Sequence, residues 1–131
     1  MGQQQLLLII LGVIVVGIAV AVGITMFQDN AVSANRDAVT NDLVNLAARA
    51  QQYYRRPQAL GGGSNNFTGL TLAKLTSKPS NANGAYAVVG SPTGNGPVVI
   101  TGTGVEKGAD GTPLIMTMNV FPDSTYVVET N

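Results

Sequence analysis

Three short groups of polar residues in the second half of the chain have types and spacing that could serve a chemical function. Gly61-Gly62-Gly63-Ser64 is typical of loops that wrap a phosphate, but it lacks the preceding strand and the following Gly-Lys-Ser/Thr of such loops. Glu106, Asp110-Gly111 and Asp123 could bind calcium, but their spacing differs from the EF-hand pattern, and a hairpin turn explains Asp110-Gly111 better. Asn66-Phe67-Thr68 matches the acceptor sequence for N-linked glycosylation, so Asn66 is a candidate site if this part is exported.

The composition argues against catalysis. The 131 residues include no His, no Cys and no Trp, so the commonest general base, the commonest metal ligand and any thiol nucleophile are missing. Seven basic and seven acidic residues cancel, which gives no indication of nucleic-acid binding. We therefore expect no enzyme, and we predict no catalytic, cofactor-binding or metal-binding residues.

The N-terminal part of the chain is an apolar run over residues 6–27, and no charged residue precedes Asp29. A helix over this run would be about 33 Å long, enough to cross the core of a bilayer. A cleaved secretory signal, a membrane anchor and the first half of a longer structural helix are the three interpretations. Ala19-Val20-Ala21 has the form of a signal cleavage site, but the basic region before it is absent and apolar residues continue after it.

The large aliphatic residues of the run are predicted to pack in the core of a bundle or filament: Leu6, Leu7, Leu8, Ile9, Ile10, Leu11, Val13, Ile14, Val15, Val16, Ile18, Val20, Val22 and Ile24. Gly12, Gly17 and Gly23 interrupt them, and each costs a helix about 1 kcal/mol relative to alanine. These glycines either allow close packing between helices or weaken the helix so that it can unwind on assembly.

The helical pattern continues beyond the apolar run. Residues 29–54 contain neither proline nor glycine, and apolar side chains recur at helical spacing. This stripe is predicted to pack on the rest of the chain: Val32, Val39, Leu43, Leu46, Ala50 and Tyr53. Pro57 and the glycines after it stop the pattern. The sequence therefore predicts one helix from near Gln3 to about Tyr54, apolar over residues 1–28 and amphipathic over residues 29–56.

The remainder of the chain reads as a small β-rich head. Residues 57–66 are predicted to form a flexible Gly/Asn-rich connection, and residues 67–131 the globular head. Short β-branched and aromatic clusters between turn signals predict strands over residues 67–72, 85–89, 98–103, 114–121 and 125–130, although residues 70–75 could instead form a helical turn. The predicted fold is α+β, with a long N-terminal helix packed on a small antiparallel sheet.

This pattern resembles bacterial type IV pilins and the related pseudopilins of type II secretion. The resemblance lies in the N-terminal QQQLLLIILGVIVVGIAVAVGI, the continuous segment LVNLAARAQQYYRR and the small glycine-rich head. In that family a dedicated peptidase cuts after a glycine before the apolar helix and often methylates the new terminus, which implies cleavage between Gly2 and Gln3 unless the chain is already mature from Met1. The family usually carries a glutamate at the fifth mature position, and this chain has no acidic residue before Asp29.

The resemblance implies a structural subunit of an extracellular type IV pilus-like filament, polymerising through its apolar helix. The expected partners are further copies of the chain, the cytoplasmic membrane before assembly, the pilus assembly machinery and a prepilin peptidase, and the expected location is the cell surface. The alternatives are a minor pilin, a pseudopilin, and a monomeric membrane-anchored module whose head binds a ligand.

Overall fold

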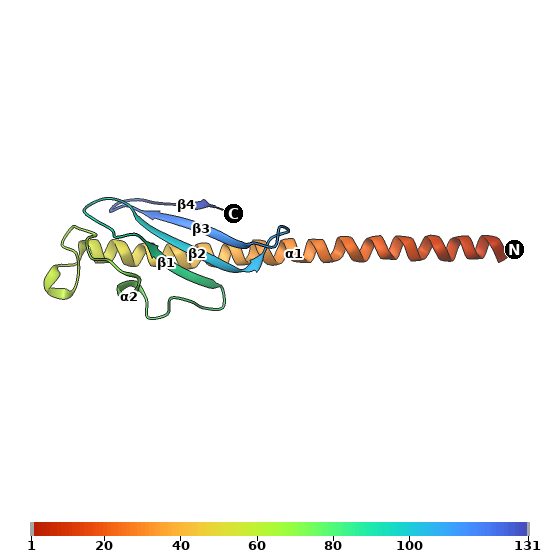
Figure 1. Cartoon of the computed structure of the whole chain (residues 1–131), viewed down its shortest axis with the longest axis horizontal. Helices are drawn as coiled ribbons and strands as arrows, with labels where there is room; N and C mark the ends of the chain where they lie inside the picture. Colours follow the sequence, from red (N-terminus) through yellow and green to blue (C-terminus); the bar gives the residue numbers. More distant parts are fainter. Residues whose placement is uncertain (1, 131) are drawn as a thin grey trace. The chain divides into compact units, whose positions relative to one another are not determined.

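The computed structural model describes residues 2–130, which form one long helix, two short helical turns and four strands (Figure 1). Helix α1 runs over Gly2–Arg55, η1 over Gln58–Leu60 and α2 over Leu72–Leu75. The chain divides into two compact units, of which the first ends at Ala31 and the second begins at Val32. The predicted α+β class and the long N-terminal helix are confirmed, and the ends of α1 lie one residue outside the predicted ones.

A single antiparallel sheet occupies the second unit. Its strands are β1 (Gly84–Val89), β2 (Val98–Lys107), β3 (Pro113–Val120) and β4 (Thr125–Glu129). They lie side by side in sequence order, so that each strand pairs with the next through a hairpin connection. The register of β2 against β3 shifts between Thr103 and Lys107, close to the hairpin that joins them. Four of the five predicted strands are found in this sheet.

The predicted strand over residues 67–72 is wrong. Phe67 and Leu70 are both buried, but the backbone between them turns. The Phe67 N–H donates to the Gly94 carbonyl and the Leu70 N–H to the Phe67 carbonyl, while Gly69 has a φ of +81°. Leu72 then begins α2. The apolar side chains that suggested a strand anchor a loop to the core instead.

One hydrophobic core lies between α1 and the inner face of the sheet. Alternate residues of β2 and β3 are buried, as expected for a sheet with one covered face. Thr40 of α1 contacts the Met116 sulfur at 3.3 Å, and the Gln51 amide donates to the Phe121 carbonyl at 3.1 Å. The largest fully buried side chains of this core are Phe67, Leu43, Ile100, Met118, Val39, Val98 and Val120.

Two glycines of β2 allow α1 to lie close against the sheet. A β-carbon on Gly102 would come within 2.8 Å of the Val39 side chain, and one on Gly104 within 2.1 Å of the Asn35 side-chain oxygen. Both distances are too short for carbon in van der Waals contact. The absence of side chains at Gly102 and Gly104 therefore sets the distance between the helix and β2.

The connection after α1 closes back on the end of the helix. Three successive N–H groups donate to carbonyls at the end of the helix: Gly63 to Tyr53 and Asn65 to Tyr54, both in the last turn of α1, and Ser64 to Arg56, the residue that follows it. A helix end leaves the carbonyls of its last turn without partners of their own. Gly63 is buried, and a β-carbon there would lie 1.7 Å from the Asn66 carbonyl oxygen. The connection over residues 57–66 therefore contains a closed turn that requires glycine at its tightest point.

Candidate functional site

The apolar run of the first unit is exposed along its whole length in the single chain. Its Leu, Ile, Val, Met and Phe side chains, including every residue predicted to lie in a filament core, are between 52% and 77% exposed. A helix that is apolar on every side requires lipid or other protein around it. By length and composition α1 could cross a membrane, a property that it shares with signal sequences.

The glycines of this run contact no other element within residues 2–130. A β-carbon on Gly12, Gly17 or Gly23 would have no atom within 4 Å, leaving aside the backbone of the helix itself. Nothing inside the described part of the chain therefore requires a small residue at these positions. Gly2 likewise has open space around it, at the start of α1 next to Gln3.

The residues predicted to pack α1 on the head lie in the second unit and mostly face its core. Val39, Leu43, Leu46, Ala50 and Tyr53 are buried. Val32, at the first position of the unit, is only half-buried.

Asn35 was absent from the predicted stripe because a polar residue does not register in a hydrophobic pattern. It is 7% exposed, its amide donates to the Asn83 carbonyl at 2.7 Å, and its side-chain oxygen accepts the Glu106 N–H at 3.3 Å. Both bonds connect α1 to the ends of strands or turns, so Asn35 joins the helix to the sheet by hydrogen bonds where the rest of the stripe uses apolar contact.

Of the three polar groups singled out in the sequence, Gly61-Gly62-Gly63-Ser64 and Asn66-Phe67-Thr68 adjoin one another after α1, whereas Asp110 belongs to a different turn. Asp110 is exposed in the turn between β2 and β3, where its carboxylate accepts the Thr112 N–H at 3.0 Å. Asn66 is half-buried, and its side-chain oxygen accepts the Thr68 N–H at 2.7 Å. Among residues 2–130, no three His, Cys, Asp or Glu side chains approach closely enough to hold a metal.

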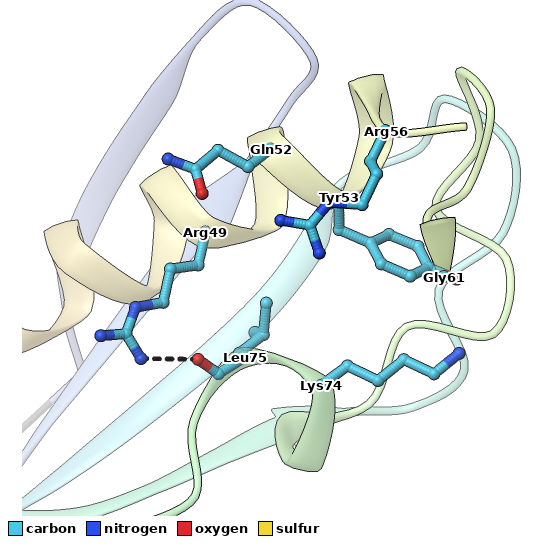
Figure 2. Close-up of a pocket in the computed structure, with 7 residues that line it drawn as sticks. All are labelled: Arg49, Gln52, Tyr53, Arg56, Gly61, Lys74 and Leu75. Carbon is cyan, nitrogen blue, oxygen red and sulfur yellow. Dashed lines mark hydrogen bonds between the residues drawn. The ribbon is translucent and has the colours of Figure 1, made fainter. Parts of the chain in front are cut away.

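A basic pocket of about 370 Å³ lies where α1 ends and α2 passes beside it (Figure 2). Arg49, Gln52 and Tyr53 follow one another at helical spacing, so they share one face of the last turns of α1, and Arg56 comes directly after the helix. Lys74 comes from α2 on the other side. The remaining lining residues are Gly61 and Leu75.

Specific contacts hold the walls of the basic pocket together. Arg49 donates to the Leu75 carbonyl at 2.7 Å, which ties α1 to the end of α2. The Lys74 ammonium lies 5.2 Å from the centre of the Tyr53 ring, within the range of a cation–π contact. The lining residues include two guanidinium groups, an ammonium group and an amide, but no carboxylate. This arrangement suits an anion.

The basic pocket was not among the predicted sites. The seven-residue spacing of Arg49 and Arg56 was the available signal, since it places both side chains on one helix face. Lys74 could not be added from the sequence, because it reaches the pocket only through α2, and the sequence predicted a strand over residues 67–72 with a helical turn over residues 70–75 only as the alternative.

A second polar cluster surrounds Asp42 on α1. One oxygen of its carboxylate accepts hydrogen bonds from the Tyr86 hydroxyl at 2.5 Å, the Asn81 amide at 2.9 Å and the Asn83 amide at 3.0 Å. Burial raises the pKa of Asp42, and these three bonds together lower it by more, so that it lies below its ordinary value of 3.8. Burial and the facing carboxylate raise the pKa of Tyr86 above its ordinary value of 10.0. The cluster fastens the segment before β1 to the helix.

We predict that the Asp42 cluster makes the stability of the second unit dependent on pH. Because the pKa of Asp42 is lower in the folded chain, its contribution is present above 3.8 and is lost as the pH falls below that value. Because the pKa of Tyr86 is raised, its contribution is present below 10.0 and is lost at higher pH. The midpoint temperature of thermal unfolding, followed by circular dichroism, should therefore decrease both at acid pH and at alkaline pH.

Two variants separate these declines. Asp42→Asn should flatten the acid decline and, since the cluster is only half-buried, lower the stability at neutral pH by about 1 kcal/mol. Tyr86→Phe should flatten the alkaline decline and leave an acid one. An acid decline of unchanged size in Asp42→Asn would contradict the assignment.

Comparison of the chain with models of protein families, with curated proteins and with solved structures finds no match. The functional features are therefore those that the structure itself provides. They are the exposed apolar helix of the first unit, and the basic pocket and Asp42 cluster of the second. The first is by far the largest surface without a covering partner in the single chain.

Proposed function

We propose that the chain is the structural subunit of an extracellular, type IV pilus-like helical filament. The observation that carries this proposal is a fully exposed apolar helix in the same chain as a compact head of one helix on a small antiparallel sheet. That architecture is compatible with a pilin-like fold. In the proposed filament the apolar helices pack together as the core, and the second units cover the outside.

The energetics of the apolar run support polymerisation. Each Leu, Ile or Val side chain gains about 1.5–3 kcal/mol when it leaves water. Because lipid satisfies these side chains about as well as protein does, the same helix would hold the subunit in the membrane before assembly. Movement from membrane to filament then needs close packing between helices and work from an assembly machinery. Gly12, Gly17 and Gly23 are suited to such close packing, since nothing in their own chain covers them.

The Gln residues at the start of α1 bear on how subunits would dock. The family usually places a carboxylate at the fifth mature position, which is Gln5 counted from Met1 and Leu7 counted from Gln3. No acidic residue lies before Asp29, and Gln3, Gln4 and Gln5 supply amides near this position. A carboxylate buried in a helix bundle is costly unless it is paired, whereas amides can hydrogen-bond to one another. We infer that uncharged amide contacts replace the charged docking contact in this filament.

A monomeric membrane-anchored binding module is the alternative function, and the basic pocket is the observation that favours it. In that case the first unit would serve only as an anchor, and the pocket would bind a soluble anion. The two functions differ in their physical state, because only the first produces a polymer. Neither requires an enzyme.

The test is electron microscopy of material sheared from cells that produce the chain, together with the intact mass of its dominant subunit. We expect filaments, and a subunit mass reduced by the loss of Met1 and Gly2. Filaments whose subunit has lost no mass would support polymerisation but reject cleavage after Gly2. A chain that stays in the membrane fraction as a monomer would reject the filament and leave the anchored module.

A pair of variants tests whether processing depends on Gly2. Gly2→Leu should keep the leader and stop filament formation, because the peptidase of this family requires glycine before its cut. Gly12→Ala, which also replaces a glycine of α1 with open space around it, should be processed like the original chain. Equal processing of both variants would contradict cleavage at Gly2.

A further inference from the structure

The charged side chains of the second unit separate by sign towards its two ends. The end where α1 finishes, called the basic end here, carries Arg49, Arg55, Arg56, Lys74 and Lys78, with Asp42 and Asp123 as its acidic residues. The end with the β2–β3 hairpin, called the acidic end, carries Asp37, Glu106, Asp110 and Glu129, with Arg36 and Lys107 as its basic residues. Figure 1 shows α2 and the end of α1 at one end of this unit and the β2–β3 connection at the other. The unit is therefore electrically polar along its length.

The basic pocket is the most concentrated positive feature of the basic end. Arg49, Arg56 and Lys74 all line it, and no carboxylate does. An anion that enters the pocket is attracted by each of these positive groups. The pocket volume of about 370 Å³ is within the range of sites that bind a small ligand, and it also admits a side chain carried at the tip of a turn.

Asp110 is the carboxylate of the acidic end best placed to reach outwards. It is exposed at the tip of the β2–β3 hairpin, between Ala109 and Gly111, so the tip is narrow. Glu129, in contrast, is engaged by Arg36 at 2.7 Å. The Thr112 side chain and N–H lower the pKa of Asp110, which keeps it ionised.

We propose that the basic pocket of one subunit receives the Asp110 carboxylate of a second copy of this chain, so that heads stack basic end to acidic end along the filament. The inference rests on the proposed function, since it assumes a polymer. Two different surfaces meet in this contact, and such a heterologous contact repeats without closing, which produces an open helical array. Complementary charges also fix the direction in which each new head docks.

Crosslinking in filaments tests the contact directly. The natural chain has no cysteine, so introduced pairs report without background. Gln52→Cys places a thiol on the wall of the basic pocket, and Ala109→Cys places one beside Asp110, and neither change removes a charge. In filaments of the double variant, a short bismaleimide should join subunit to subunit and give a ladder of dimers, trimers and larger species on a denaturing gel. Filaments of either single-cysteine variant should give no crosslinked species larger than a dimer.

The role of charge is tested in the double-cysteine background. Asp110→Asn should reduce the ladder about two- to fivefold, the range expected for an exposed ion pair. Asp123→Asn also removes an exposed turn carboxylate, from the other end of the head, and should leave the ladder unchanged. Salt of about 1 M, where the screening length is about 3 Å, should reduce the ladder of the parent double variant in the same direction as Asp110→Asn.

The outcomes distinguish this contact from the filament itself. Absence of filaments would reject the proposed function before the contact is tested. Filaments without a ladder, or with a ladder that Asp110→Asn leaves unchanged, would overturn the contact and leave the polymer standing. Saturable binding of inorganic phosphate to such filaments, lost on Arg56→Ala, would assign the pocket to a small anion and would also overturn the contact.

Discussion

Replacing Val15 with aspartate should abolish filaments in sheared material. Val15 lies midway along the apolar run and is 57% exposed in the single chain, so in any assembly it faces lipid or another helix. A carboxylate at the centre of a membrane-spanning helix costs about 3 kcal/mol, and an unpaired charge buried in a protein bundle costs about as much. Either cost corresponds to a factor of about one hundred in an equilibrium. The measurement is filament yield by electron microscopy, with immunoblots of membrane and sheared fractions.

Val89→Asp is the matched control. Val89 belongs to β1 and is 52% exposed, close to the value for Val15, but it lies on the face of the sheet that points away from the core. A carboxylate there remains in water, and filament yield should change little. Val15→Leu, which keeps the position apolar, should also assemble. Filaments of Val15→Asp at the original yield would show that the apolar run is not the polymerisation surface.

Adding a single methyl group at Gly104 should destabilise the second unit by about 2–3 kcal/mol. The new β-carbon of Gly104→Ala would lie 2.1 Å from the Asn35 side-chain oxygen. Asn35 cannot retreat without losing its hydrogen bonds to Asn83 and Glu106, so overpacking and lost hydrogen bonds act together. Thermal unfolding of the full chain in detergent should show a midpoint about 10 °C lower for the β-structure.

The neighbour on the opposite face of the strand provides the comparison. Thr103→Ala alters β2 one residue away, but the Thr103 side chain is half-exposed and faces away from α1. Its effect should remain within about 0.5–1 kcal/mol. An equal loss of stability in both variants would mean that strand propensity, and not the approach of α1, determines the need for glycine.

The long helix and the sheet were predictable because their signals are local. Helical periodicity without glycine or proline identifies residues 29–54, and β-branched clusters between turns identify four strands. Residues 67–72 were misread for an instructive reason. Phe67 and Leu70 are apolar because they anchor a loop to the core, and a short apolar segment carries no mark that separates a strand from an anchored loop.

The polar sites were much less predictable, because each joins residues that are distant in the sequence. The basic pocket needs Lys74 of α2 beside Arg49 of α1 and Arg56, which follows α1. The Asp42 cluster needs the turn before β1 to fold onto the helix. Hydrophobic patterning locates the elements that bury apolar area, but it contains no information on which polar side chains those elements bring together.

The direction of the strands gives the head a mechanical property. Asn35 of α1 lies beside Gly104 of β2, and Gln51 bonds to Phe121 just after β3, so the strands run along this part of α1. A pull between the two ends of the head acts along the strands and across their hydrogen bonds, which lie perpendicular to the strands. The bonds of each ladder then bear the load together in shear, and they cannot open one after another as they would if a strand were peeled from its edge. A chain without a single disulfide can in this way resist tension through the orientation of its sheet.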